Sequence, residues 1–424
     1  MNKKKYFRFL SFALIITSTL MIVANNVPYL GSFRFLWAPI GLISFILLKS
    51  KILSHKMSIS VLMYGVLFAG ILQYTLWNFA SDWYKQIILG DFYNLIIFVF
   101  LAVYLLTARE FVFWGRLAKW GVYFLIITAI MTIVATQIAP MVVRASYSGG
   151  LDKLEGFTAL YKLGFGSYGF AISLVAFIPI VVYFIKSKIN IVFSKNFLWS
   201  IFIVLIITLI QMQIFANILV GMLLIVLSLV SAKNRKNTFF WIIGLVLIFS
   251  IIPLKIYADI LINIGSTFST DSNVYYKLND MASYIVNSNV SDTGMGVRYA
   301  RYPELLTVFF AQPIVGDASY NSSFYNEMVN GGHLYWMSRL ALWGVFGFIG
   351  YLLILKNIFQ PIFNLFDKEF RYYYGLSLLS VFILGLVKNL TGREQYVMLL
   401  IIIPGLYFLS KTKLEIRKQK QLNR

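Results

Sequence analysis

Apolar runs long enough to cross a membrane recur along the whole chain, and this feature constrains its fold more than any other. The core of a bilayer is about 30 Å thick, so a spanning helix needs about 20 apolar residues. Backbone groups in lipid must be paired within their own segment, which predicts helices. We therefore predict an all-α, polytopic membrane protein with about twelve transmembrane helices. The runs cover 7–25, 33–48, 57–79, 92–107, 117–139, 164–185, 197–213, 215–231, 238–256, 334–355, 372–388 and 395–410.

The composition agrees with a lipid-facing surface. Of the 424 residues, 59% are hydrophobic and only 12% are charged, and the mean hydropathy is +0.78. A soluble domain carries about 25% charged residues. The lipid bilayer is therefore the first expected partner. The first run follows a basic start but lacks a signal-peptide cleavage pattern, so we interpret it as an uncleaved span.

The unbroken apolar stretch 197–231 is too long for one crossing, because a single helix of that length would extend about 52 Å. Gln211, Gln213 and Asn217 form a polar band at its middle. This band predicts a tight hairpin between two spans.

The distribution of positive charge predicts the orientation. The formal net charge is +21, and most of the 37 Lys and Arg residues lie in alternate short connections and in the tail. Such residues are retained on the cytoplasmic side. We expect both termini in the cytoplasm of a bacterial cell, with the chain in its cytoplasmic (inner) membrane. Nucleic-acid binding is disfavoured, because the basic residues are dispersed and do not share one face.

The same pattern predicts four regions. Residues 1–256 form a membrane domain of nine spans, and 257–333 form one large outer loop that carries the chemistry. Residues 334–410 contain three further spans, and 411–424 form a basic cytoplasmic tail. A loop this long is uncommon unless it is functional.

Part of this loop has helical periodicity. In RYPELLTVFFAQP, Pro303 suits a first helical position and Pro313 ends the helix. Leu305, Leu306 and Phe309 give it an apolar face. We expect a helix at the membrane interface that covers a cavity.

Several kinds of site are excluded by residue counts. The chain has no cysteine, which excludes disulfides, Cys-ligated zinc and a thiol nucleophile. Its two histidines, His55 and His333, are too few for a multi-His metal site. The sequence has no Asp-x-Asp, and the carboxylates of the outer loop are scattered. We therefore expect no metal and no cofactor.

Two arginines in the outer loop are candidates for binding a phosphate or diphosphate. Arg298 and Arg301 lie three residues apart and share one side of a helix if the helix extends back that far. Two guanidinium groups suit bidentate contacts to phosphate oxygens. The alternative is that they contact lipid phosphates as ordinary interfacial residues.

His333 and Arg339 mark the start of the tenth span. His333 follows two glycines, and an imidazole suits proton transfer near neutral pH. Arg339 lies further in, where a charge is costly and a functional role is the default hypothesis. The alternatives are a histidine that caps a helix and an arginine that extends back to the interface.

These residues resemble the superfamily of O-antigen polymerases and O-antigen ligases, which are membrane glycosyltransferases. The family pattern has an Arg, an aromatic residue four positions on, and then a Pro-x-x-Gly turn, matched here by Arg298, Tyr302 and Pro313 to Gly316. The family's next span opens with a His followed by Gly at eleven and fourteen residues, matched by His333, Gly344 and Gly347.

The chain also departs from this pattern. Leu334 replaces the common Asn after the His, Tyr302 replaces the usual Trp, and Ala318 replaces the second Gly of the turn. The family's Ser-Arg pair near span seven is absent, and QMQIFAN stands in its place. Arg144, Lys388 and Arg393 are candidates for the missing positive charge.

The resemblance implies a GT-C-like fold and a polymerase of polysaccharide repeat units, for O-antigen or capsule. Such an enzyme moves a growing glycan from undecaprenyl diphosphate to a second undecaprenyl-diphosphate-linked oligosaccharide. It implies His333, Arg298 and Arg301 as catalytic residues, with Arg339, Arg144, Arg393 and Lys388 in substrate binding. A chain-length regulator and a flippase are implied partners.

Three alternatives remain open. One is an O-antigen ligase, which moves finished glycan onto the lipid A core. Another is a flippase or other transporter of lipid-linked oligosaccharide, and the last is a structural membrane protein without activity. A transporter is disfavoured because we expect no ionisable residues in the middle of the membrane and find no internal repeat.

Overall fold

The computed structural model describes residues 52–66, 81–109, 111–139, 142–143, 165–187, 192–212, 214–230, 254–270, 275–276, 278–279, 281–283, 294–320, 334–388, 390 and 393–422. Every regular element in this part of the chain is a helix, as predicted. The predicted spans 7–25 and 33–48 lie outside the described residues, as does 238–256 except for its last three residues.

Six helical segments of the described residues are long and apolar enough to cross a membrane. They include α5 (Asp82–Ala108), α6 (Phe111–Ile138), α9 (Tyr168–Lys186), α16 (Tyr335–Leu365) and α17 (Lys368–Val387). The sixth, Glu394–Glu415, runs through α18 (Arg393–Tyr396), η5 (Val397–Ile402) and α19 (Ile403–Leu422). A helical membrane protein is thereby confirmed, whereas the count of about twelve spans stays a prediction.

The long stretch 197–231 turns where the polar band lies. It forms two shorter apolar helices, α10 (Lys195–Gln211) and α11 (Phe215–Leu229), which are separated at Met212 to Ile214. Lys186 Nζ, at the end of α9, donates to the carbonyls of Ser228 and Leu229 at 3.0 and 2.6 Å. The end of α11 therefore returns to the level at which α9 ends and α10 begins, which confirms the predicted hairpin.

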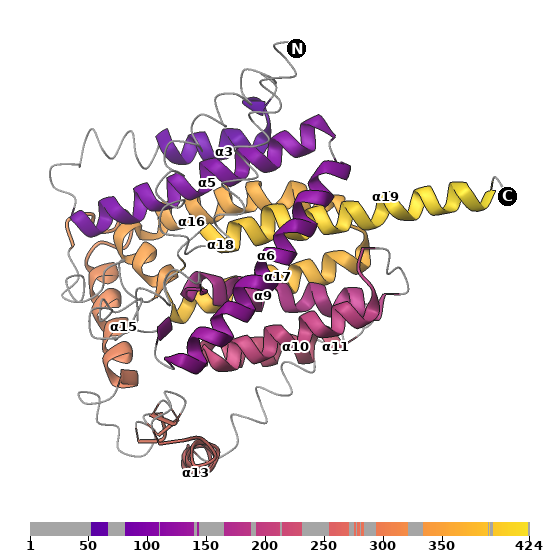
Figure 1. Cartoon of the computed structure of the whole chain (residues 1–424). Coiled ribbons are helices and arrows are strands. Elements are labelled where there is room, and N and C mark those ends of the chain that lie inside the picture. The colour runs from indigo at the N-terminus through magenta and orange to yellow at the C-terminus, as the bar shows by residue number, and fades with distance from the viewer. Residues whose placement is uncertain are drawn as a thin grey trace.

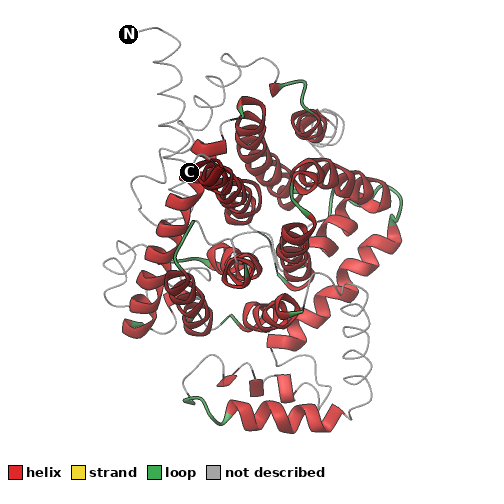
Figure 2. Cartoon of the chain, turned by 90° about the vertical axis from the view of Figure 1, so that its right-hand side faces the viewer, coloured by secondary structure: helices red, strands yellow, loops and turns green. Residues whose placement is uncertain are grey.

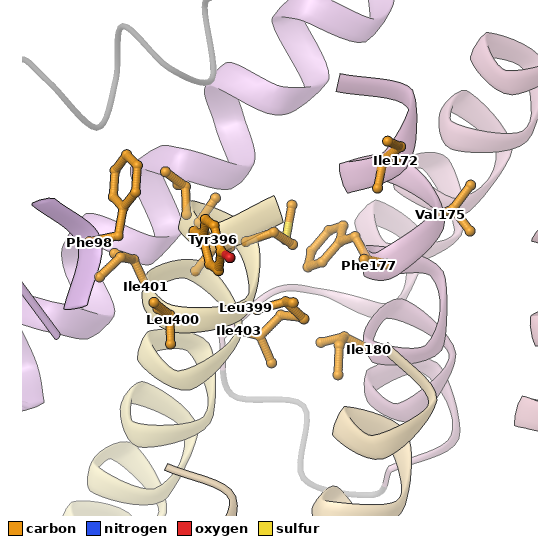
Figure 3. Packing of buried hydrophobic residues seen from close by; sticks show 14 of the residues in the cluster. Phe98, Ile172, Val175, Phe177, Ile180, Tyr396, Leu399, Leu400, Ile401 and Ile403 are labelled. Carbon is orange, nitrogen blue, oxygen red and sulfur yellow. The ribbon is translucent and has the colours of Figure 1, made fainter. Parts of the chain in front are cut away.

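α9 is almost entirely buried and packs against α10, α11, α17 and the start of the sixth segment (Figure 1). In Figure 3, Phe177 and Ile180 of α9 point toward Leu399 and Ile403. η5 is a π-helix, a rare form found mostly as a single turn within an α-helix, and two carbonyls of this turn accept bonds from neighbouring side chains. Trp114 Nε1 donates to the Ile401 carbonyl at 2.8 Å, and Tyr374 donates to the Leu399 carbonyl at 3.0 Å. These bonds tie the sixth segment to its neighbours.

α16 is not the single straight span predicted for 334–355. Gly344 has φ 61° and ψ −173°, which breaks the helix into a first arm (335–343) and a second arm (345–365). In a straight helix Tyr335 and Tyr351 would lie about 24 Å apart along the axis, yet their hydroxyl oxygens are 2.5 Å apart. The chain therefore bends sharply at Gly344. The second arm alone is about 31 Å long, enough to span a bilayer.

α15 (Gly294–Ala311) lies across one end of the bundle, and the C-terminal part of α19 leaves the other end (Figure 1). The predicted start of this helix at Pro303 is wrong, because α15 begins at Gly294 and Pro303 lies inside it. Its predicted end before Pro313 is confirmed.

α13 (Leu254–Gly265) lies crosswise below the bundle (Figure 2). The remaining short helix, α3 (Lys56–Tyr64), packs beside α5 and α16; His55 caps it by accepting from the Met57 N–H.

Candidate functional site

α15 and the first arm of α16 both contact the end of α17. The Tyr302 hydroxyl of α15 donates to the Leu386 carbonyl at 2.5 Å, and the Tyr335 N–H donates to the Lys388 carbonyl at 3.1 Å. The last carbonyls of a helix lack partners within it, so these donors satisfy groups that would otherwise be open. Burial raises the pKa of Tyr302.

The Pro313 to Gly316 turn inserts into the break of α16. The Val345 and Phe346 N–H groups donate to the carbonyls of Pro313 and Ile314 at 2.8 and 3.3 Å, and the Asp317 N–H donates to the Ala341 carbonyl at 3.1 Å. The turn thus caps both arms. We call this contact, made by 313–317 with 341–346, the interlock.

Both glycines of the interlock are required by its geometry. Gly316 has φ 73° and Gly344 has φ 61°, a region that favours glycine. A Cβ on Gly316 would lie 2.4 Å from the Gly344 nitrogen, and a Cβ on Gly344 would lie 2.4 Å from the Ile314 oxygen. Two pieces of the sequence motif, the Pro-x-x-Gly turn and the glycine eleven residues after His333, are therefore packed against each other.

The structure describes some of the predicted site residues fully, some only by their backbone, and some not at all. α15 extends back far enough to carry both Arg298 and Arg301, which fulfils the condition for their sharing a helix. Arg301 is buried, with 4% of its surface exposed, and only the backbone of Arg298 is described. Arg144 and His333 lie outside the described residues.

Lys388 is also buried, and it lies at the start of α9. Its Nζ is 5.3 Å from the centre of the Tyr168 ring, a cation–π distance. Arg393 is the first residue of α18, and only its backbone is described. The Lys388 carbonyl binds the first arm of α16, so Lys388 joins that arm to α9. Lys388, which ends α17, therefore lies beside the carbonyl that Tyr302 of α15 contacts.

Two buried polar residues, Glu394 and Gln395, were not singled out in the sequence; they follow the end of α17 in the chain. Glu394 and Gln395 are buried at the start of the sixth segment, and the Ser167 hydroxyl donates to Glu394 Oε1 at 3.5 Å. A signal was available, because a charged residue directly before a long apolar run is a candidate for function.

Arg339 has a partner that the sequence did not reveal. Its Nε and Nη2 donate to Asp91 Oδ2 of α5 at 2.9 and 2.5 Å, and its Nη1 donates to the Tyr335 carbonyl at 3.1 Å. The guanidinium carbon lies 3.2 Å from the centre of the Tyr335 ring. Both charged residues are buried, with 3% and 4% of their surface exposed.

This ion pair bears on one expectation. We expected Arg339 inside a span but no acidic partner for it; Asp91 and Arg339 both lie near the start of two candidate spans, so the expectation for the middle of the membrane stays a prediction. Asp91 interrupts the apolar run in LGDFYNLIIF, and this interruption was the available signal.

An apolar cavity of about 420 Å³ adjoins this polar cluster. It lies between the second arm of α16, α17 and the start of the sixth segment, and Tyr335, Trp336 and Tyr396 line it. Its size and lining suit an apolar chain. Among the described residues, no three carboxylates or histidines are grouped as metal ligands.

The described residues thus contain buried basic side chains and an apolar cavity within a helical membrane domain. In the comparisons with known proteins, no family model and no curated protein matches this chain.

Proposed function

We propose that the protein polymerises lipid-linked polysaccharide repeat units, transferring a growing glycan from undecaprenyl diphosphate to another lipid-linked unit. The observation that carries the proposal is that motif residues distant in sequence contact α16 and the end of α17. Tyr302 binds the Leu386 carbonyl, the Pro313 to Gly316 turn binds α16 at Gly344, and Tyr335 binds the Lys388 carbonyl. Pieces of the motif that are distant in sequence therefore share one region.

The proposed reaction breaks the bond between the anomeric carbon and the diphosphate oxygen. A new glycosidic bond forms to a hydroxyl oxygen of the acceptor sugar, and undecaprenyl diphosphate leaves. His333 takes the proton of the acceptor hydroxyl. Arg298 and Arg301, on one helix, stabilise the negative charge that gathers on the leaving diphosphate.

The test is chain extension by the purified protein on a synthetic diphosphate-linked repeat unit. His333→Ala should reduce the rate by about 10²- to 10⁴-fold, while binding of the carrier persists because the arginines remain. His55→Ala, which changes the only other histidine, is the matched control and should keep the wild-type rate. Near-normal extension by His333→Ala would remove the base from the mechanism.

The same assay separates polymerase from ligase. A polymerase lengthens the chain when a second lipid-linked unit is the acceptor, whereas a ligase needs a lipid A core acceptor. Transfer to the core acceptor alone would replace the proposal with the O-antigen ligase.

A transporter of lipid-linked oligosaccharide is the second candidate, and the buried Asp91–Arg339 pair favours it. Ionisable residues inside a bundle commonly line the path of a transported solute. Liposomes that contain the protein and a labelled lipid-linked unit distinguish the two. Movement of the label to the other leaflet without chain extension would support the transporter.

A further inference from the structure

We propose that Asp91 is a positioning residue, which holds the first arm of α16 in place through Arg339. The activity part of this proposal rests on the proposed function, because the first arm begins directly after His333 in the sequence. The structural part does not rest on it. The role replaces substrate binding by Arg339.

The contacts of Arg339 support positioning better than ligand binding. Three of its nitrogens already donate to Asp91 and to the Tyr335 carbonyl. One face of the guanidinium lies on the Tyr335 ring. An arginine that is almost completely buried and bonded in this way presents few donors to a diphosphate.

Asp91 contacts the first arm directly and the second arm through Tyr335. Tyr335 of the first arm is hydrogen-bonded to Tyr351 of the second, and the Tyr335 hydroxyl also lies 3.5 Å from both Asp91 oxygens. Trp343 and Tyr351 pack against each other with ring centres 5.1 Å apart. The carboxylate therefore sits where the two arms meet.

The start of α5 also contacts the residue that follows the interlock. The Ser81 N–H, at the start of α5, donates to the carbonyl of Ala318, which comes directly after Asp317. Ser81 and Asp91 are about 15 Å apart along the helix axis. α5 therefore contacts the bent region at two positions, through Ser81 and through Asp91.

The energetics favour a role in conformation. A buried ion pair often stabilises a fold no better than apolar residues of the same size, whereas removal of one partner is strongly destabilising. The charges therefore serve to select one arrangement of the first arm. A bend that depends on this pair should relax when the pair is broken.

Cysteine cross-linking tests the structural part directly, because the chain has no native cysteine. Cysteines at Trp336 and Phe348, whose ring centres are 6.3 Å apart, report the bend; in a straight helix these residues would be about 18 Å apart. A second pair at Phe111 and Phe408, 4.5 Å apart, reports the fold elsewhere.

Asp91→Asn should slow the first cross-link by about tenfold or more and leave the second unchanged. Asp91→Glu should restore part of the rate, and Asp82→Asn, an exposed acid of the same helix, should have no effect. The double variant Asp91→Asn with Arg339→Gln should be no worse than Asp91→Asn, because the two residues act as a unit. Wild-type cross-linking in Asp91→Asn, or loss of both cross-links, would overturn the proposal.

The kinetic measurement addresses the role in catalysis. In the chain-extension assay Asp91→Asn should lower kcat by about 10²-fold, the effect of a small misplacement, with little change in KM for the carrier. A raised KM at normal kcat would assign the pair to substrate binding instead. If the wild-type protein extends no chains, the proposed function fails while the cross-linking result still decides the positioning role.

Discussion

Among the charged residues, Arg339 is assigned to the fold by its contacts. Arg339 is enclosed by Asp91 and Tyr335, whereas Arg298 lies on a helix that covers the end of the bundle. The donors of Arg339 are therefore used within the protein.

Arg298 is the residue for which a change of chemistry is most informative. Arg298→Ala should abolish polymer, and Arg298→Lys should recover little, because an ammonium lacks the planar pair of donors that grips two phosphate oxygens. The measurement is polymer length in cells with a matched protein level. Lys255→Ala, an exposed basic residue of α13, is the control and should give normal chains. Full-length polymer in Arg298→Ala cells would exclude Arg298 from the site.

Asp367 predicts how stability changes with acid. Burial alone would raise the pKa of its carboxyl, but hydrogen bonds from Lys411 at 2.8 Å and from the Phe370 N–H at 2.9 Å hold that pKa below its ordinary value. The lowered folded-state pKa means that this contribution to stability is present above the unfolded pKa, near pH 4, and is lost as pH falls through the folded value.

Thermal unfolding of the detergent-purified protein between about pH 7 and pH 3 measures this contribution. The melting temperature of the wild type should fall more steeply below about pH 4 than that of Asp367→Asn. Parallel curves for the two proteins would show that the Lys411 contact does not contribute.

At the level of elements, the interlock caps both arms of α16 at the bend. The turn supplies carbonyls to the first N–H groups of the second arm, which a continuous helix would have bonded internally. The bend therefore leaves these backbone groups satisfied, as burial in a membrane requires.

Gly344→Ala should destabilise the protein by about 1–3 kcal/mol from its backbone conformation alone, and the new Cβ would also displace the Ile314 carbonyl. Gly350→Ala, six residues further along the same helix, places its Cβ in open space and should be neutral or stabilising by up to about 1 kcal/mol. Melting temperatures of both variants in detergent provide the comparison. Equal melting temperatures would contradict the strained geometry at Gly344.

For the whole molecule, the placement of α15 and the end of α19 at opposite ends of the bundle (Figure 1) matches an outer loop and a cytoplasmic tail. Reporter fusions that are active only outside the cytoplasmic membrane test the orientation. We expect activity for a fusion at Thr270 and none for fusions at Arg235 and Arg424. Outside activity at Arg235 would contradict the twelve-span arrangement.

The sequence by itself determined the class of the protein and several of its boundaries. Apolar length predicted helices in a membrane, because lipid admits no unpaired backbone. The polar band near Gln211 predicted the hairpin of α10 and α11, and Pro313 predicted the end of α15, because proline cannot continue a helix. These are local effects, so they can be recognised in local sequence.

Only the tertiary structure decided the bend of α16 and the pairing of Asp91 with Arg339. Gly344 permits a left-handed backbone, but a glycine in a helix does not have to break it. At the bend, the turn before Asp317 caps both arms, and Asp91 of α5 binds Arg339 of the first arm. Likewise Asp91 and Arg339 are far apart in sequence, and the residues around one do not indicate that the other is its partner. Contacts between distant segments depend on how whole helices pack, which is why the sequence alone did not predict them.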